Sequence, residues 1–89
     1  MRGARLVRFA GHTVCAANSP AFESEIGNAL AAKRPPFAVV WSEQGGKIRV
    51  SLRAIGRFDV SKIAEKYGGG GHSNAAGFNL PRDRKLPWT

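Results

Sequence analysis

The feature that most limits the fold is a pair of apolar segments joined by a Gly-Gly turn. "FAVVW", residues 37–41, is a continuous apolar run, which is typical of a strand covered on both faces. "IRVSLRA", residues 48–54, alternates strictly, and "SEQGGK" between the two segments is typical of a turn. We therefore expect a hairpin whose second strand has an apolar face and a polar face. Ile48, Val50 and Leu52 form the first face, and Arg49, Ser51 and Arg53 form the second.

The segment before this hairpin predicts two strands and a helix. "ARLVRFA" and "HTVCAAN" are typical of short strands around a tight turn at Gly11. In "SPAFESEIGNALAAK", Ser19 is placed to cap a helix and Pro20 to occupy its first position. Pro35 and Pro36 then end the helix. The apolar residues at helical spacing are Phe22, Ile26, Ala29 and Leu30.

The segment after the hairpin predicts a second helix, "DVSKIAEKY", which Asp59 is placed to cap and Gly68 to close. We expect Ser73 to Ala76 to form one short helix and "GFNL" to form a final strand. We thus expect residues 1–89 to form a single small α/β domain, with a mixed sheet of about five strands flanked by two or three helices. The inner side of the second helix consists of Val60, Ile63, Ala64 and Tyr67.

The charge balance favours anionic partners. Lys and Arg number 14 and Asp and Glu number 6, for a formal net charge of +8. Such a surplus on a small domain suits nucleic acids or nucleotides, although a solubility surface gives the same count. No apolar run reaches the length of a membrane span and no signal-peptide core is visible. We expect a cytoplasmic protein that does not engage a membrane.

The glycine run "GGGGHSNAAGF", residues 68–78, is the strongest local signal of a site. Glycine loses more backbone freedom on folding than any other residue, so the run marks a place where the backbone approaches something closely. A glycine-rich loop entering a helix presents free N–H groups that bind phosphate, with His72 at its rim. A close-packed structural turn explains the same pattern, and the residues alone leave both interpretations open.

A family resemblance adds to this reading. The glycine run, preceded by "DVSKIAEKY" and "VSLRA", resembles the C-terminal DHH-associated domain of the DHH phosphoesterases. "AANSPAFESEIGNALA" is similar to the first strand-to-helix segment of that domain, so the resemblance covers nearly the whole chain. The family includes nanoRNases, pAp-type phosphatases and single-strand exonucleases.

The resemblance implies a set of substrate-binding residues. In nanoRNase-like members this domain faces the catalytic domain across a cleft and holds the substrate. By resemblance, Arg53 of "SLRA" and His72 contact a substrate phosphate, and Gly69, Gly70 and Gly71 bring backbone amides near it. Ser51 and Asn74 are their neighbours, and for both a structural hydrogen bond is favoured over contact with the substrate. The implied partners are short RNA or DNA oligonucleotides or pAp-type nucleotides.

The resemblance places the chemistry elsewhere. The family binds two metal ions, manganese or magnesium, on a separate DHH catalytic domain, whereas no acidic pair here shows metal-ligand spacing. We expect no catalytic residue, metal ligand or cofactor in this chain, and no activity from it alone. Two alternatives stay open: an RNA-binding or assembly module like the C-terminal domain of alanyl-tRNA synthetases, and an inactive structural fragment. Glycines followed by arginine are usual in the synthetase branch, whereas His72 follows them here.

Overall fold

The computed structural model describes residues 4–83 and 85–89, which form one six-stranded sheet and two helices. The small α/β domain expected from the sequence is confirmed. The strands are β1 (Ala4–Phe9), β2 (His12–Asn18), β3 (Phe37–Gln44), β4 (Lys47–Ala54), β5 (Gly70–His72) and β6 (Ala75–Pro81). The helices are α1 (Glu23–Lys33) and α2 (Ser61–Glu65).

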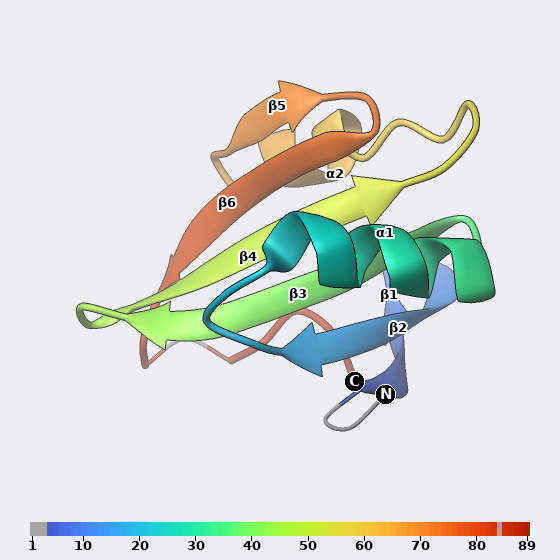
Figure 1. Ribbon diagram of the computed structural model, residues 1–89. Helices are drawn as coiled ribbons and strands as arrows, with labels where there is room; N and C mark the ends of the chain where they lie inside the picture. Colours follow the sequence, from blue (N-terminus) through green and yellow to red (C-terminus); the bar gives the residue numbers. More distant parts are fainter. Residues whose placement is uncertain (1–3, 84) are drawn as a thin grey trace.

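The sheet is mixed, with the strand order β1-β2-β3-β4-β6-β5 (Figure 1). Only the β2–β3 pair is parallel in the described part of the chain, and α1 is the crossover between these strands. The expected β3–β4 hairpin is confirmed, with Phe37 opposite Ala54 and Gln44 opposite Lys47. Its turn requires glycine, because Gly45 and Gly46 both have positive φ.

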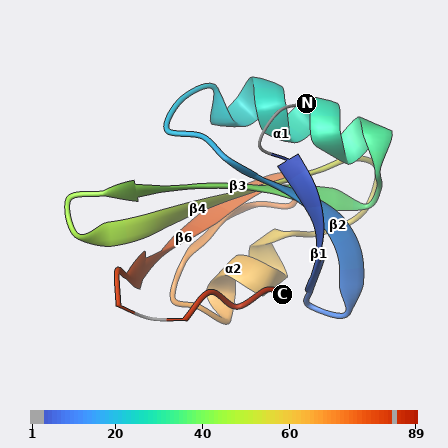
Figure 2. The same ribbon diagram turned by 90° about the horizontal axis from the view of Figure 1, so that it is seen from below.

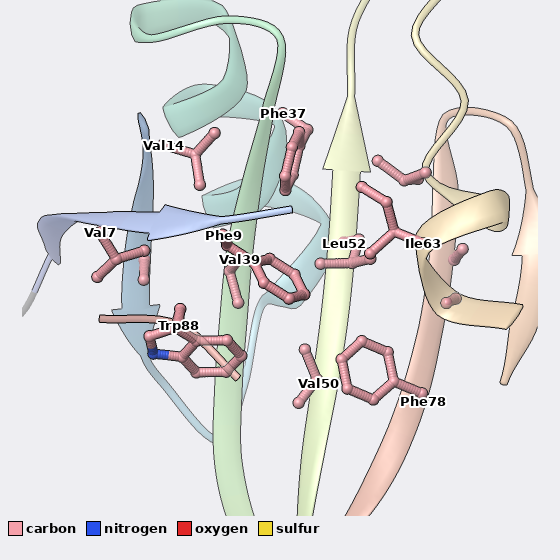
Figure 3. Close-up of a cluster of buried hydrophobic side chains, with 14 of the residues drawn as sticks. Val7, Phe9, Val14, Phe37, Val39, Val50, Leu52, Ile63, Phe78 and Trp88 are labelled. Atoms are coloured by element: carbon pink, nitrogen blue, oxygen red, sulfur yellow. The ribbon is translucent and has the colours of Figure 1, made fainter. Parts of the chain in front are cut away.

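The two helices cover opposite faces of the sheet (Figure 2). The larger core lies on the α2 side, where Phe9 packs against Phe37, Phe78 and Trp88 (Figure 3). The predicted apolar face of β4 belongs to this core. On the other face α1 packs mainly across β2, β3 and β4, over a smaller cluster of buried residues. These are Ala17, Leu30, Ala31 and Ala38.

The second helix has its predicted inner side but is shorter than expected. Helix α2 spans only Ser61–Glu65, and its N-cap position is Val60 and not Asp59. The Asp59 carboxylate accepts hydrogen bonds from the backbone N–H and the hydroxyl of Ser61. These bonds lower the pKa of Asp59, because they favour the charged carboxylate. Gly68 has φ +84°, the left-handed conformation expected after the helix. Val60, Ile63 and Ala64 are buried, and Tyr67 is half-buried against Phe78.

The predicted start of the first helix was wrong. Helix α1 begins at Glu23, and Ser19 does not cap it. The Ser19 hydroxyl instead bonds the backbone of Ala21 in a tight turn, donating to its carbonyl and accepting from its N–H. The expected helical face was also partly wrong, because Phe22 and Ala29 are exposed. Gly27 and Ala31 are buried beneath the helix in their place.

The short helix expected after His72 was also wrong. Ser73 and Asn74 form the turn of a hairpin between β5 and β6, and β6 already begins at Ala75. Three residues, two of them glycine, form β5, so no side-chain pattern in the sequence marks it as a strand. Its strand conformation comes from pairing with β6. Residues 70–72 of the glycine run are therefore an edge strand, and the run is not a loop that enters a helix.

Candidate functional site

One part of the sheet carries most of the predicted site residues. On the α1 side of β4, β6 and β5, the register brings together a surface of polar and small side chains, and of these strands α1 mainly contacts β4. We call it the platform. Its residues are Arg49, Ser51, Arg53, Gly70, His72, Ala75, Gly77 and Asn79.

Arg53 and His72 lie in one cross-strand row of the platform. Arg53 of β4 pairs with Ala75 of β6, and Ala75 pairs with His72 of β5. Directly opposed residues in antiparallel strands point to the same face, so both side chains rise on the α1 side of the sheet. Only the methyl group of Ala75 lies between them. The next row, two residues along each strand, is Ser51, Gly77 and Gly70.

Helix α1 positions the Arg53 side chain. Arg53 is half-buried, and its stem lies beneath Gly27, where an added Cβ would be 2.5 Å from Arg53 Cγ. Its guanidinium donates one hydrogen bond to the Leu52 carbonyl at 2.9 Å and one to the Ser24 hydroxyl at 3.1 Å. The ion pair Arg82–Glu43 is the only one among the described residues, so no carboxylate neutralises Arg53. The group keeps further N–H donors for a ligand.

Packing against β6 explains why two positions of the run, 69 and 71, are glycine. A Cβ on Gly69 would collide with the Gly77 carbonyl and would lie 2.6 Å from Phe78 Cβ. Gly71 has φ +147°, and its Cβ would lie 2.6 Å from the Ala75 carbonyl oxygen. Both glycines therefore let the β5 backbone approach β6 more closely than any other residue could.

Packing does not explain why position 70 is glycine. Its φ lies outside the left-handed range, and a Cβ added there would meet no atom within 4 Å. Gly70 shares its row with Ser51 and Gly77, so this Cβ would project over the platform. His72 is exposed, and it ends β5 on the same face. The glycine run thus combines close packing against β6 with one open position.

The remaining predicted residues, Ser51 and Asn74, lie differently. Ser51 is on the platform but only 3% exposed, in the row beside Arg53. The Asn74 amide donates to the carbonyls of Gly56 and Phe58, each at 3.2 Å, and so ties the β5–β6 turn to the loop after β4. Asn74 thus makes structural hydrogen bonds of the kind that its place in the sequence favours.

The described residues do not fit a metal site. Among residues 4–83 and 85–89, no three His, Cys, Asp or Glu side chains gather closely enough to hold an ion. A two-metal centre needs several such ligands together, so its ions do not fit this platform. In the same part of the chain, neither helix is long and apolar enough to cross a bilayer. The cytoplasmic location stays a prediction.

Sequence reasoning missed the role of α1 in this site. Ser24 and Gly27 hold Arg53 from the helix packed over the same face of the sheet, and neither was proposed. Gly27 did carry a signal, because a glycine inside a helical pattern costs stability unless close packing requires it. Ser24 carried none, since serine is common in the first turn of helices.

Comparisons with known proteins agree with the family resemblance seen in the sequence. The family model described as the DHHA1 domain matches residues 11–87. Oligoribonuclease NrnB of Bacillus subtilis is 40% identical over 70 residues, which cover 78% of this chain and 18% of that protein. An uncharacterised protein of Acanthamoeba polyphaga mimivirus is 46% identical over 65 residues, 67% of this chain and 15% of the relative.

A solved structure has the same architecture. An uncharacterised protein from Helicobacter pylori superposes with a TM-score of 0.71 and 27% identity, over 91% of this chain and 24% of that one. The chain therefore spans less than a quarter of each of these longer proteins. Because the family model covers most of the sequence, this chain belongs to the DHHA1 domain family, the domain found in DHH phosphoesterases such as oligoribonuclease NrnB.

Proposed function

We propose that this domain binds a phosphate of short oligonucleotides or pAp-type nucleotides on the platform and presents it to a DHH catalytic domain. The alignment of Arg53 and His72 in one cross-strand row carries this proposal. Strands in a sheet lie about 4.8 Å apart, so the Cα atoms of these residues are roughly 10 Å apart. A phosphate above Ala75 is then within reach of both side chains.

The chemistry of the row suits a phosphate. Arginine presents a planar fork of N–H donors that matches two phosphate oxygens, and hydrogen bonds to an anion are stronger than neutral ones. Arg53 is held by the Leu52 carbonyl and the Ser24 hydroxyl, so little side-chain freedom is lost when a ligand binds. His72 adds an imidazole donor from the opposite side of the row.

Gly70 supports the same position for the ligand. Nothing within the described residues requires a glycine there, yet any larger side chain would project over the platform. A phosphate lying against the β5 backbone requires this space. The net charge of +8 favours the approach of such a ligand to the whole domain.

The proposal divides the work between two domains. Manganese or magnesium ions on the DHH catalytic domain would activate the attacking water and stabilise the leaving oxygen. In this chain the platform residues only bind and orient the substrate, and none of them takes part in bond breaking. The domain alone is then a binding module without hydrolytic activity.

The proposal is tested by titrating the 89-residue chain with a labelled 5′-phosphorylated diribonucleotide at low and high salt. Binding is expected at low salt and should weaken steeply as salt rises, because neutralising phosphates releases counterions. The matched control ligand is the same diribonucleotide without its 5′-phosphate. It keeps only the bridging phosphodiester and should bind more weakly. If the chain binds neither ligand at low salt, the proposed function is wrong.

A further inference from the structure

Phe22 is the least expected residue of the structure. Its side chain is 67% exposed, although its spacing in the sequence predicts a buried helical position. Its backbone is left-handed, with φ 60° and ψ 36°. A bulky residue in this region is a conformational outlier, and such strain is typical of functional sites. Packing in the core therefore does not explain why a bulky side chain stands at this strained backbone position.

Local structure does not explain Phe22. Among the described residues only Ala10 shares a positive φ without being glycine, and Ala10 lies in the tight turn between β1 and β2, which requires it. The backbone around Phe22 is well fixed. Ser19 bonds Ala21 and donates its N–H to the Trp41 carbonyl, and Phe22 accepts from the N–H of Ile26. The ring is thus held in solvent by an ordered backbone.

Phe22 is close to the proposed phosphate position. The Arg53 guanidinium donates to the Ser24 hydroxyl at 3.1 Å, and Ser24 is two residues from Phe22. Consecutive Cα atoms are 3.8 Å apart, so the Cα atoms of Phe22 and Ser24 lie within about 7.6 Å. Figure 1 shows the first turn of α1 beside β4, on the side toward β6. The exposed ring and the free donors of Arg53 therefore belong to one region of the surface.

The charges around Phe22 decide which part of a ligand fits there. Glu23 and Glu25 follow it in the first turn of α1. These two carboxylates repel a phosphate at this point, whereas an uncharged nucleobase has no net charge for them to repel. A nucleotide has both parts, joined by its sugar. Its phosphate then belongs at Arg53 and its base at Phe22.

From this arrangement we infer that Phe22 is a stacking surface for the nucleobase of the ligand whose phosphate lies on Arg53. The inference rests on the proposed function and adds to it a second contact, which separates nucleotides from other phosphates. Every base has an apolar face, so stacking on Phe22 gives affinity without choosing among bases. The left-handed backbone sets the ring out from the helix before any ligand arrives.

The test compares a ligand that has a base with one that lacks it. The first is a 5′-phosphorylated dinucleotide containing 2-aminopurine, whose fluorescence falls when it stacks, and the second is ribose 5-phosphate. Phe22→Leu removes the ring but keeps an apolar side chain. Phe22→Gly removes the ring and suits the left-handed backbone. Leu6→Ala is the matched control, because Leu6 is also exposed, at 53%, but lies on β1 away from the platform.

Phe22→Leu is expected to weaken dinucleotide binding about tenfold, within the range for one base–aromatic stack, and to reduce the fluorescence change. Binding of ribose 5-phosphate should not change. Phe22→Gly should weaken the dinucleotide equally while melting at the same or a higher temperature, which excludes unfolding as the cause. Leu6→Ala should bind both ligands normally.

Three results would overturn the inference, and they are distinguishable. If Phe22→Leu binds the dinucleotide as the unmodified chain does, no base lies on Phe22. If it weakens ribose 5-phosphate equally, Phe22 supports the phosphate position and does not stack. If the unmodified chain binds neither ligand, the proposed function itself fails, and this inference fails with it.

Discussion

Arg53 and His72 lie opposite the same residue, Ala75, from its two sides. Ala75 is on β6, which separates the strands of Arg53 and His72 in the sheet although the chain reaches β6 last. The return of β6 between β4 and β5 therefore brings residues 53 and 72 into one row. The glycine run allows this, because β5 must lie close against β6 to complete the row.

The two neighbours His72 and Asn74 should respond differently to alanine. His72 is exposed, and its side chain makes no hydrogen bond among the described residues, so His72→Ala should leave the melting temperature unchanged and weaken phosphate binding by roughly 1–3 kcal/mol. Asn74→Ala removes hydrogen bonds to Gly56 and Phe58 and should cost about 1–2 kcal/mol of stability. Thermal melting and nucleotide titration of both variants test this. A large loss of stability in His72→Ala would make its role structural.

Gly70→Ala should separate binding from folding. The new methyl group meets no atom within 4 Å, so the variant should melt within a few degrees of the unmodified chain. Nucleotide affinity should fall several-fold, because the methyl group occupies space that the phosphate needs. Gly69→Ala is the contrast, since its methyl group collides with the Gly77 carbonyl and should destabilise the hairpin. Normal binding by Gly70→Ala would argue against a ligand at β5.

Gly27→Ala should act on the site through Arg53. The added methyl group would lie 2.5 Å from Arg53 Cγ, so the arginine must leave its bond to Ser24. Overpacking costs about 1–3 kcal/mol and alanine returns about 1 kcal/mol of helix propensity, for a net loss of roughly 0–2 kcal/mol. Nucleotide affinity should fall although Gly27 faces no ligand. Asn28→Ala, at the next and exposed position, should raise stability slightly and bind normally.

The start of α2 should make stability depend on acid pH. Hydrogen bonds from Ser61 lower the pKa of Asp59 in the folded chain from 3.8, so its stabilising effect is complete above the unfolded value. The effect is lost as the pH falls through the lowered pKa. Asp59→Ala should therefore melt below the unmodified chain at pH 7, and the gap should close at strongly acid pH. A gap that does not change between those limits would show that the carboxylate charge is unimportant there.

The sequence predicted those parts of the fold whose signals are local. Alternation over residues 48–54 and the Gly-Gly turn predicted the β3–β4 hairpin and the face on which Arg53 lies. Asp59 and Gly68 predicted the place of the second helix, because each acts on the backbone next to it, although the helix itself is limited to Ser61–Glu65. These interactions depend on neighbours in the chain and not on the rest of the fold.

The parts that failed depend on distant contacts or competing local bonds. The β5 strand has no apolar pattern, and its pairing comes from close approach to β6. Ser19 followed by Pro20 is typical of a helix start, but its hydroxyl closes a turn instead and the helix begins later. The phosphate contact of Arg53 came from family resemblance, and that of His72 from the glycine run and the resemblance together. Their common row became visible only through the register of β6.

The most direct test is the nucleotide affinity of Arg53→Lys beside Arg57→Lys. Both variants keep the net charge, but only Arg53 lies on the platform, whereas Arg57 is exposed in the loop before α2. Lysine cannot reproduce the planar fork, so Arg53→Lys should weaken binding of the 5′-phosphorylated diribonucleotide by roughly 1–3 kcal/mol. The affinity is measured well below the melting temperature of the variant. Arg57→Lys should bind normally. Equal affinities for the two variants would contradict the account.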